Sequence, residues 1–183
     1  MARLPIINPE NSTGKAHDLL TAVNKKLGLV PNMTRVMANS PAVLEAYLQF
    51  SGSLEGGSLD AKSRERIALE TAEANQCEYC LSAHSAIGKM VGLSEAEILD
   101  SRRAHSKDVK SAAALHFSRL VIEKRGAVNE ADVEAARKAG LTNGELAEVV
   151  ALTVLNLFTN YVNTAFQVDI DFPVVKGLSA VAR

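Results

Sequence analysis

The sequence predicts an all-α fold, and three features of the chain lead to that prediction. Apolar residues recur with a period of about 3.6 between clusters of Gly and Pro. Typical helix-start and helix-stop residues lie at those clusters. No alternating apolar and polar run is bounded by hairpin turns. We therefore expect helices almost everywhere and almost no strand.

Each helix is predicted between such signals. In chain order, the predicted helices cover residues 15–27, 33–38, 42–54, 61–75, 78–91, 95–103, 108–125, 130–139 and 143–168. Pro31 and Pro41 mark the starts of the second and third helices, because proline is favoured in a first turn. Ser94 and Glu97 form a capping box before the sixth. Four glycines end helical segments where a left-handed residue is needed: Gly57, Gly92, Gly126 and Gly140.

The last predicted helix is unusually apolar. From Ala147 to Phe158 only Glu148, Thr153 and Asn156 interrupt the apolar residues. Such a helix is central to a fold or covered by another subunit, so we expect a homo-oligomer.

The chain also carries a weak internal echo. Sliding it by 83 residues lays Glu65 on Glu148, and the two cysteines on Asn160 and Asn163. A shorter echo pairs Gly92-Leu93-Ser94 with Gly140-Leu141-Thr142. An internally duplicated helical unit is therefore an alternative to a single unrepeated one.

Composition restricts the class of protein. The 183 residues carry 20 basic and 21 acidic side chains, a net charge of −1, and the pI is near 6.4. Nucleic-acid binding proteins need a basic face, which this balance does not suggest. No stretch reaches the roughly 20 uninterrupted apolar residues of a membrane span, and the N-terminus lacks the pattern of a signal peptide. We expect one cytoplasmic domain over residues 1–183, with its core motif in 60–100.

Two neighbouring helices hold the residues that could perform chemistry. On the first, Glu65 shares a face with small apolar residues, and a carboxylate placed there needs a hydrogen-bonding partner. The opposite face is expected to be solvated and carries Lys62, Arg66, Glu70 and Glu73. On the second helix, the inner face carries Cys80, His84, Ile87 and Val91, and the outer face Glu78, Ser82, Ser85 and Lys89.

These residues are the parts of a thiol redox site. Cys77 and Cys80 form a CxxC pair that can close a disulfide. A thiolate attacks a hydroperoxide to give a sulfenic acid, which a second cysteine resolves. His84, one turn after Cys80, suits proton transfer near neutral pH, and Glu65 could orient it. The helix dipole favours Cys77 as the attacking thiol and the nearby histidine favours Cys80, so residue chemistry leaves the choice open.

Other readings of the same residues remain. Cys77, Cys80 and His84 fit three ligands of a zinc site, although a structural site needs a fourth ligand and no second pair is evident. Glu65 could be purely structural. The protein could also be a redox sensor with little turnover. Finally, Glu65 and His84 could act as acid and base in an enzyme that uses no thiol.

The chain contains the motif Glu65, eleven intervening residues, Cys77-x-Tyr79-Cys80, three further residues and His84. This motif resembles the signature of the carboxymuconolactone decarboxylase superfamily in its alkylhydroperoxidase D-like branch. The segments Gly28–Asn32 and Ser40–Leu44 resemble the N-terminal helices of that family, and the segment around Asn160 and Asn163 its C-terminal helix.

The resemblance implies an oligomeric helical bundle that reduces hydroperoxides without metal, haem or flavin. An external thiol or a lipoylated protein would supply the electrons, and a homo-oligomer (dimer, trimer or hexamer) would be expected. Cys80 would be the peroxidatic cysteine, Cys77 the resolving one, and Glu65 with His84 the proton relay. One position departs from the family: Tyr79 stands where the relay has a second histidine, and tyrosine is a poor base near neutral pH. Tyr79 is therefore assigned at most a supporting role.

Overall fold

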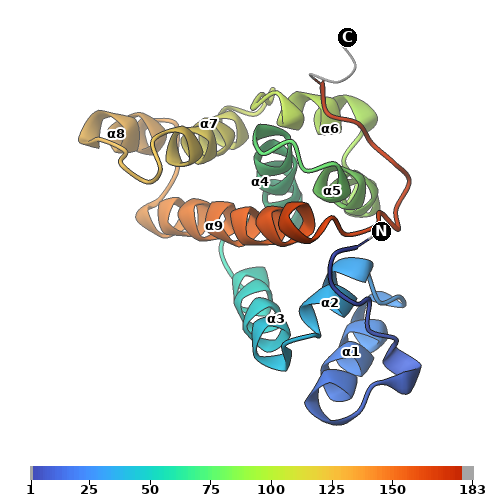
Figure 1. The fold of residues 1–183 in the computed structure, drawn as a ribbon. Coiled ribbons are helices and arrows are strands. Elements are labelled where there is room, and N and C mark those ends of the chain that lie inside the picture. Colours follow the sequence, from blue (N-terminus) through green and yellow to red (C-terminus); the bar gives the residue numbers. More distant parts are fainter. Residues whose placement is uncertain (1, 179–183) are drawn as a thin grey trace.

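The computed structural model describes residues 2–178, and within that range the chain is all-α, as predicted (Figure 1). A short 3-10 helix, Pro9–Asn11, precedes the α-helices. These are α1 (Gly14–Leu27), α2 (Asn32–Met37), α3 (Pro41–Glu55), α4 (Ala61–Ala74), α5 (Glu78–Met90), α6 (Glu95–Arg102), α7 (Val109–Glu123), α8 (Glu130–Lys138) and α9 (Asn143–Phe166). Every predicted helix is present, with ends within two residues of the predicted ones.

Local capping explains why the helix ends could be predicted. The capping box of Ser94 and Glu97 is formed at α6, and Thr142 with Glu145 forms another at α9. Each follows a left-handed glycine, Gly92 at φ 87° and Gly140 at φ 102°. The shorter internal echo therefore corresponds to one local structure used twice. The longer echo does not: the chain breaks between α4 and α5, whereas α9 is continuous through the equivalent positions. A duplicated unit stays a prediction.

Helix α4 lies at the centre of the larger half of the molecule, where it packs against α5, α6, α7 and α9. Helices α1 to α3 form a smaller group beside the C-terminal half of α9, so that the two groups meet at an angle (Figure 1). The segment after α9 runs back along α5 toward α6 (Figure 1).

The expected solvated face of α4 is wrong for Glu70 and Glu73, where α6 and α7 cover the helix, whereas Lys62 is exposed as expected. Glu70 is fully buried, where it accepts hydrogen bonds from Arg119 and from the Ser118 hydroxyl. Glu73 is paired with Arg102 over 2.8 Å. These charges are buried in pairs, which is how proteins accommodate ionised groups away from water.

The expected outer face of α5 is wrong at its two serines, while Lys89 is exposed as expected. Ser82 and Ser85 are buried, and the segment after α9 contacts Ser82. The backbone N–H of Val175 donates to the Ser82 hydroxyl over 2.9 Å, which fastens that segment to α5. Short hydroxyl side chains on a helix do not distinguish a solvated face from one that a later segment covers.

Gly57 is required for a different reason than the one predicted. Gly57 does not have the positive φ angle that Gly92, Gly126 and Gly140 have. A Cβ at this position would lie 2.7 Å from Oε2 of Glu148. That carboxylate approaches closely because it accepts the backbone N–H groups of Ser58 and Leu59, each over 2.8 Å. The α3–α4 connection is thereby tied to α9.

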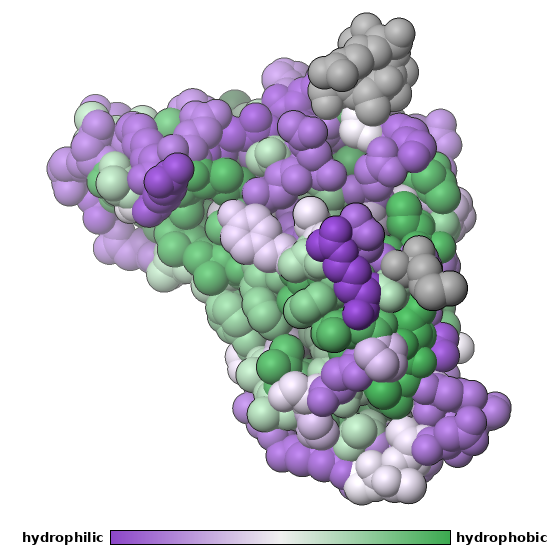
Figure 2. All heavy atoms as spheres, viewed as in Figure 1, coloured by the Kyte–Doolittle hydropathy of each residue, from purple (hydrophilic) through white to green (hydrophobic). Residues whose placement is uncertain are grey.

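Helix α9 is long and apolar enough to cross a membrane by length and composition, but the core helix of a soluble protein passes the same test. It packs against α3, α4, α5 and α7, as a core helix does. Apolar surface gathers where α9 lies beside α3 (Figure 2). On the outer side of α9, four apolar side chains remain exposed at helical spacing: Val150, Val154, Phe158 and Tyr161.

Candidate functional site

The turn between α4 and α5 brings together the residues predicted to act. Gln76 takes a left-handed conformation, with φ 54°, and α5 packs back against α4. The Asn75 side-chain amide donates to the carbonyl oxygen of Thr71 over 2.8 Å and to Oδ1 of Asn160 over 3.2 Å, so α9 supports the turn. Cys77 then caps α5, because the backbone N–H of Cys80 donates to its sulfur over 3.3 Å.

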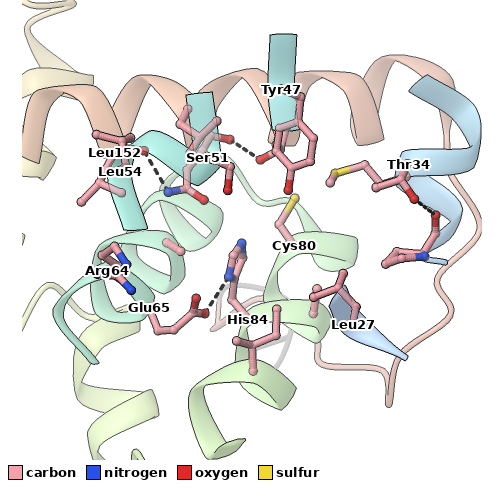
Figure 3. A pocket seen from close by; sticks show the side chains of 18 of the residues that line it. Leu27, Thr34, Tyr47, Ser51, Leu54, Arg64, Glu65, Cys80, His84 and Leu152 are labelled. Atoms are coloured by element: carbon pink, nitrogen blue, oxygen red, sulfur yellow. Dashed lines mark hydrogen bonds and ion pairs between the residues drawn. The ribbon is translucent and has the colours of Figure 1, made fainter. Parts of the chain in front are cut away.

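A cavity of about 350 Å³ lies between the α1–α3 group and the helices α4, α5 and α9 (Figure 3). This volume suits a small organic molecule. Most of the wall is apolar, with side chains such as Leu27, Leu54 and Leu152. Four of the predicted residues line this cavity, namely Glu65, Cys80, His84 and the supporting Tyr79, so the structure places them around one space.

The two cysteines are bonded to one another but differ in position. Their Cα atoms are 5.3 Å apart, within the usual range for a disulfide. Both residues are buried. Cys80 belongs to the cavity wall, whereas Cys77 does not and lies behind it at the start of α5. A molecule in the cavity therefore meets the sulfur of Cys80.

Asn163 of α9 contacts the Cys80 sulfur. Its side-chain amide donates to Sγ of Cys80 over 3.2 Å and to Sδ of Met33 over 3.3 Å. This orientation is the one that two sulfur acceptors require, since the amide oxygen has no hydrogen to offer them. Asn163 is buried, so the hydrogen bond to Cys80 is formed away from water. An N–H donor stabilises a thiolate relative to a thiol.

Glu65 and His84 form a hydrogen-bonded pair between α4 and α5. Nδ1 of His84 lies 2.8 Å from Oε2 of Glu65, and Figure 3 shows both side chains at the cavity beside Cys80. A carboxylate at one ring nitrogen fixes the orientation of the imidazole and leaves the other nitrogen for proton transfer. The contact predicted for Glu65 is therefore formed, and it is made with His84.

The two tyrosines of the cavity have different surroundings. The Tyr79 hydroxyl accepts the backbone N–H of Met33 over 3.1 Å, and its ring stacks edge-on against Phe172. Burial raises the pKa of Tyr79, and the Asp171 carboxylate raises it further. Tyr47, on α3, directs its hydroxyl toward the side of the cavity that holds the Cys80 sulfur (Figure 3). Burial, helped by the charges of Glu65 and Glu55, raises the pKa of Tyr47 to about 12.

Two of these residues escaped the sequence reasoning as members of the site. Asn163 was indicated only as the position that the 83-residue shift lays on Cys80, and no role followed from that. Tyr47 belongs to no motif. It reaches the site from α3, a helix outside the α4–α5 stretch that holds the other predicted residues. Among residues 2–178, no group of three or more His, Cys, Asp and Glu side chains is placed to hold a metal ion.

Comparisons with known proteins find a family match and several structures of the same fold. A model of the carboxymuconolactone decarboxylase family matches residues 41–124. An uncharacterised protein of Haemophilus influenzae is 48% identical over 46 residues, a match that spans 25% of this chain and 41% of that protein.

Solved structures cover much more of the chain. A peroxidase-related protein from Ralstonia eutropha JMP134 with an alkylhydroperoxidase AhpD core has a TM-score of 0.80 and 26% identity, over 93% of this chain and 92% of that one. A peroxidase-related protein from Silicibacter sp. TM1040 has a TM-score of 0.80 and 23% identity, over 91% and 88%. A debrominase in complex with 2,3,4-tribromopyrrole has a TM-score of 0.76 at 16% identity, over 93% and 92%, and is similar in fold.

The family match, the shared fold and the CxxC pair all indicate a relative of peroxidase-related proteins. Residues 41–124 thus match the carboxymuconolactone decarboxylase family, and the chain as a whole is similar to peroxidase-related proteins with an alkylhydroperoxidase AhpD core.

Proposed function

We propose that this protein is a CxxC-dependent organic hydroperoxide reductase in which Cys80 is peroxidatic and Cys77 resolving. The observation that carries the proposal is the position of the two sulfurs: Cys80 lies on the cavity wall and Cys77 behind it, within bonding distance. The family match and the CxxC pair fit a peroxidase-related role.

The proposed reaction has three steps. The Cys80 thiolate attacks the outer oxygen of ROOH, the O–O bond breaks, and the products are the Cys80 sulfenic acid and RO⁻, which takes a proton to become ROH. The Cys77 thiol attacks the sulfenic sulfur, giving the disulfide and water. An external dithiol then reduces the disulfide and is itself oxidised.

The neighbouring side chains suit this chemistry. Asn163 donates to the sulfur and favours its ionised form. His84, held by Glu65, accepts the thiol proton and carries it to the products. With its mainly apolar wall, the cavity favours an organic hydroperoxide over hydrogen peroxide. We propose a small dithiol or a lipoylated protein as the reductant, no resident cofactor, and a cytoplasmic location.

We also propose that the protein works as a homo-oligomer, with no nucleic acid or membrane as partner. The exposed stripe of Val150, Val154, Phe158 and Tyr161 supports this, because the four side chains lie along one side of α9. A second copy of the chain is the proposed cover for this stripe.

The proposed reaction is tested by counting thiols after one equivalent of cumene hydroperoxide. The wild type should lose both thiols rapidly, and a sulfenate should be trapped in Cys77→Ser but not in Cys80→Ser. If both thiols of the reduced wild type survive, the protein is not a thiol peroxidase.

Two alternatives use the same residues differently. A redox sensor predicts that oxidation changes the assembly state while turnover stays negligible. An acid–base enzyme is favoured by the Glu65–His84 pair alone, and it predicts that a Cys77→Ser, Cys80→Ser double variant keeps full activity on its substrate.

A further inference from the structure

The Tyr47 hydroxyl is a polar group with no assigned task. It lies on the wall of the cavity, and among residues 2–178 no hydrogen bond occupies it. The other tyrosine of the cavity, Tyr79, has its hydroxyl engaged by the backbone of Met33. An unengaged hydroxyl in a mainly apolar cavity is available to a bound molecule, and specific polar contacts of this kind orient ligands.

Its position relative to Cys80 restricts what it would contact. Cys80 comes from α5 and Tyr47 from α3, and the hydroxyl points across the cavity toward the sulfur side (Figure 3). A thiolate that displaces an oxygen attacks along the O–O bond, so the leaving oxygen faces away from the sulfur. Because the Tyr47 hydroxyl faces the Cys80 sulfur (Figure 3), a hydroperoxide bound between the two would turn its leaving oxygen toward α3.

We propose that Tyr47 is a further catalytic residue, which donates its hydroxyl proton to the leaving oxygen when Cys80 attacks an alkyl hydroperoxide. This inference rests on the proposed peroxidase function.

Every proton that the proposed step moves comes from, and returns to, a group of the site or the products. His84 takes the proton of the Cys80 thiol, the thiolate forms the S–O bond, and the O–O bond breaks. Tyr47 protonates the departing RO⁻ to give ROH, and the imidazolium of His84 returns a proton to the tyrosinate. The sum is Cys80–SH plus ROOH giving Cys80–SOH plus ROH.

The acidity of Tyr47 suits this task. With its pKa raised to about 12, the side chain is neutral near pH 7 and carries the proton to be donated. It is still a stronger acid than an aliphatic alcohol, so transfer to an alkoxide is downhill. The effect of the Glu65 charge on Tyr47 places the hydroxyl within electrostatic reach of the Glu65–His84 pair that would restore it.

The test compares two oxidants with different leaving groups. The alkoxide released by tert-butyl hydroperoxide needs a proton, whereas the acetate released by peracetic acid is stable as an anion. Stopped-flow rates of thiol loss are measured with both oxidants for the reduced wild type, Tyr47→Phe and Tyr161→Phe. Tyr161 is a matched control because the same side chain there does not line the cavity.

We expect Tyr47→Phe to react about a hundredfold more slowly with tert-butyl hydroperoxide and almost normally with peracetic acid. Tyr161→Phe should match the wild type with both oxidants. An equal loss with both oxidants would show a structural role for Tyr47, and no loss with either would show no role; each overturns the inference. If the wild type itself reacts with neither oxidant, the proposed peroxidase function fails first, and the two failures are thereby distinguished.

Discussion

Oε2 of Glu65 lies 2.8 Å from Nδ1 of His84, and the two side chains are only 15% and 21% exposed. The pair joins α4 to α5 at the cavity, one helical turn along α5 from Cys80. A histidine held in this way has a fixed orientation, which is a requirement for efficient proton transfer.

Glu65→Gln should therefore slow the reaction with hydroperoxide. Glutamine keeps an oxygen that can accept from the imidazole but removes the negative charge that Glu65 places beside the ring. We expect the stopped-flow rate of thiol loss to fall about tenfold to a hundredfold, with the urea midpoint little changed. Glu55→Gln is the matched control, since Glu55 also lines the cavity but is paired with Lys26. Equal rates in both variants would contradict a role for the Glu65–His84 pair.

Asn163→Leu should make Cys80 harder to ionise, because it removes the N–H that donates to the sulfur over 3.2 Å. We expect the pH midpoint of iodoacetamide alkylation, measured in a Cys77→Ser background, to rise by about one pH unit. Asn156→Leu is the control: Asn156 also lines the cavity, but its amide donates to the backbone carbonyl of Leu152. The assignment is wrong if both variants shift the midpoint equally.

Asp60 predicts a pH dependence of stability. Its carboxylate accepts the backbone N–H of Ser63 at the start of α4, and this hydrogen bond lowers the pKa of Asp60 from its ordinary 3.8. A group whose pKa is lower in the folded state contributes stability above the unfolded pKa, and the contribution is lost as the pH falls through the folded one. Asp60→Asn keeps a capping oxygen without the charge.

The variant should accordingly be less stable than the wild type by about 0.5 kcal/mol at pH 7, and the two should converge below pH 3.8. Urea unfolding at several pH values measures the difference. A difference that stays constant with pH would mean that the Asp60 charge contributes nothing.

The buried pair of Glu70 and Arg119 predicts a large effect on stability. Arg119→Met leaves the fully buried Glu70 carboxylate without its cation, which typically costs about 3 kcal/mol. The double variant Arg119→Met, Glu70→Gln should recover part of that loss, because no buried charge remains. Lys26→Met, which breaks the exposed pair with Glu55, should cost less than about 1 kcal/mol. Chemical denaturation followed by circular dichroism compares the four proteins.

The stripe on α9 predicts the assembly state. Light scattering should give the wild type a mass that is a multiple of the 19.5 kDa chain. Phe158→Glu places a charge within the stripe and should shift the protein to a single chain while its helix content is unchanged. A wild type that already runs as one chain would overturn the proposed homo-oligomer.

Local signals in the sequence were sufficient to predict the helices. Ser94, Thr142 and their glutamates cap helices through contacts three residues apart, so the relevant information is contiguous in the chain. The covering of α4 could not be predicted in this way. Glu70 resembles a solvated residue in its helical pattern, and only the arrival of α7 with Arg119 makes it a buried one.

The candidate site shows the same division. Glu65, Cys77, Cys80 and His84 lie within one stretch whose spacing carries the motif, and their placement together was predicted. Asn163 comes from a helix 83 positions later than Cys80, and its contact depends on how α9 crosses α5. The acidic, basic and thiol groups were thus predictable, whereas the neutral groups that surround the sulfur needed the tertiary structure.

The construction of the cavity has a consequence for how such a protein could diversify. Every group proposed to react lies within residues 41–124, the part that the family model matches. Leu27 and Met33 on one side of the cavity, and Leu152 and Phe172 on another, lie outside that part. Replacing the first helices or the segment after α9 would alter which molecules fit while the reacting groups stayed in place. Part of the cavity wall is therefore encoded outside the stretch that holds the proposed reacting groups, although other wall residues such as Leu54 lie within it, and new selectivity can be sought in the outer part without rebuilding those groups.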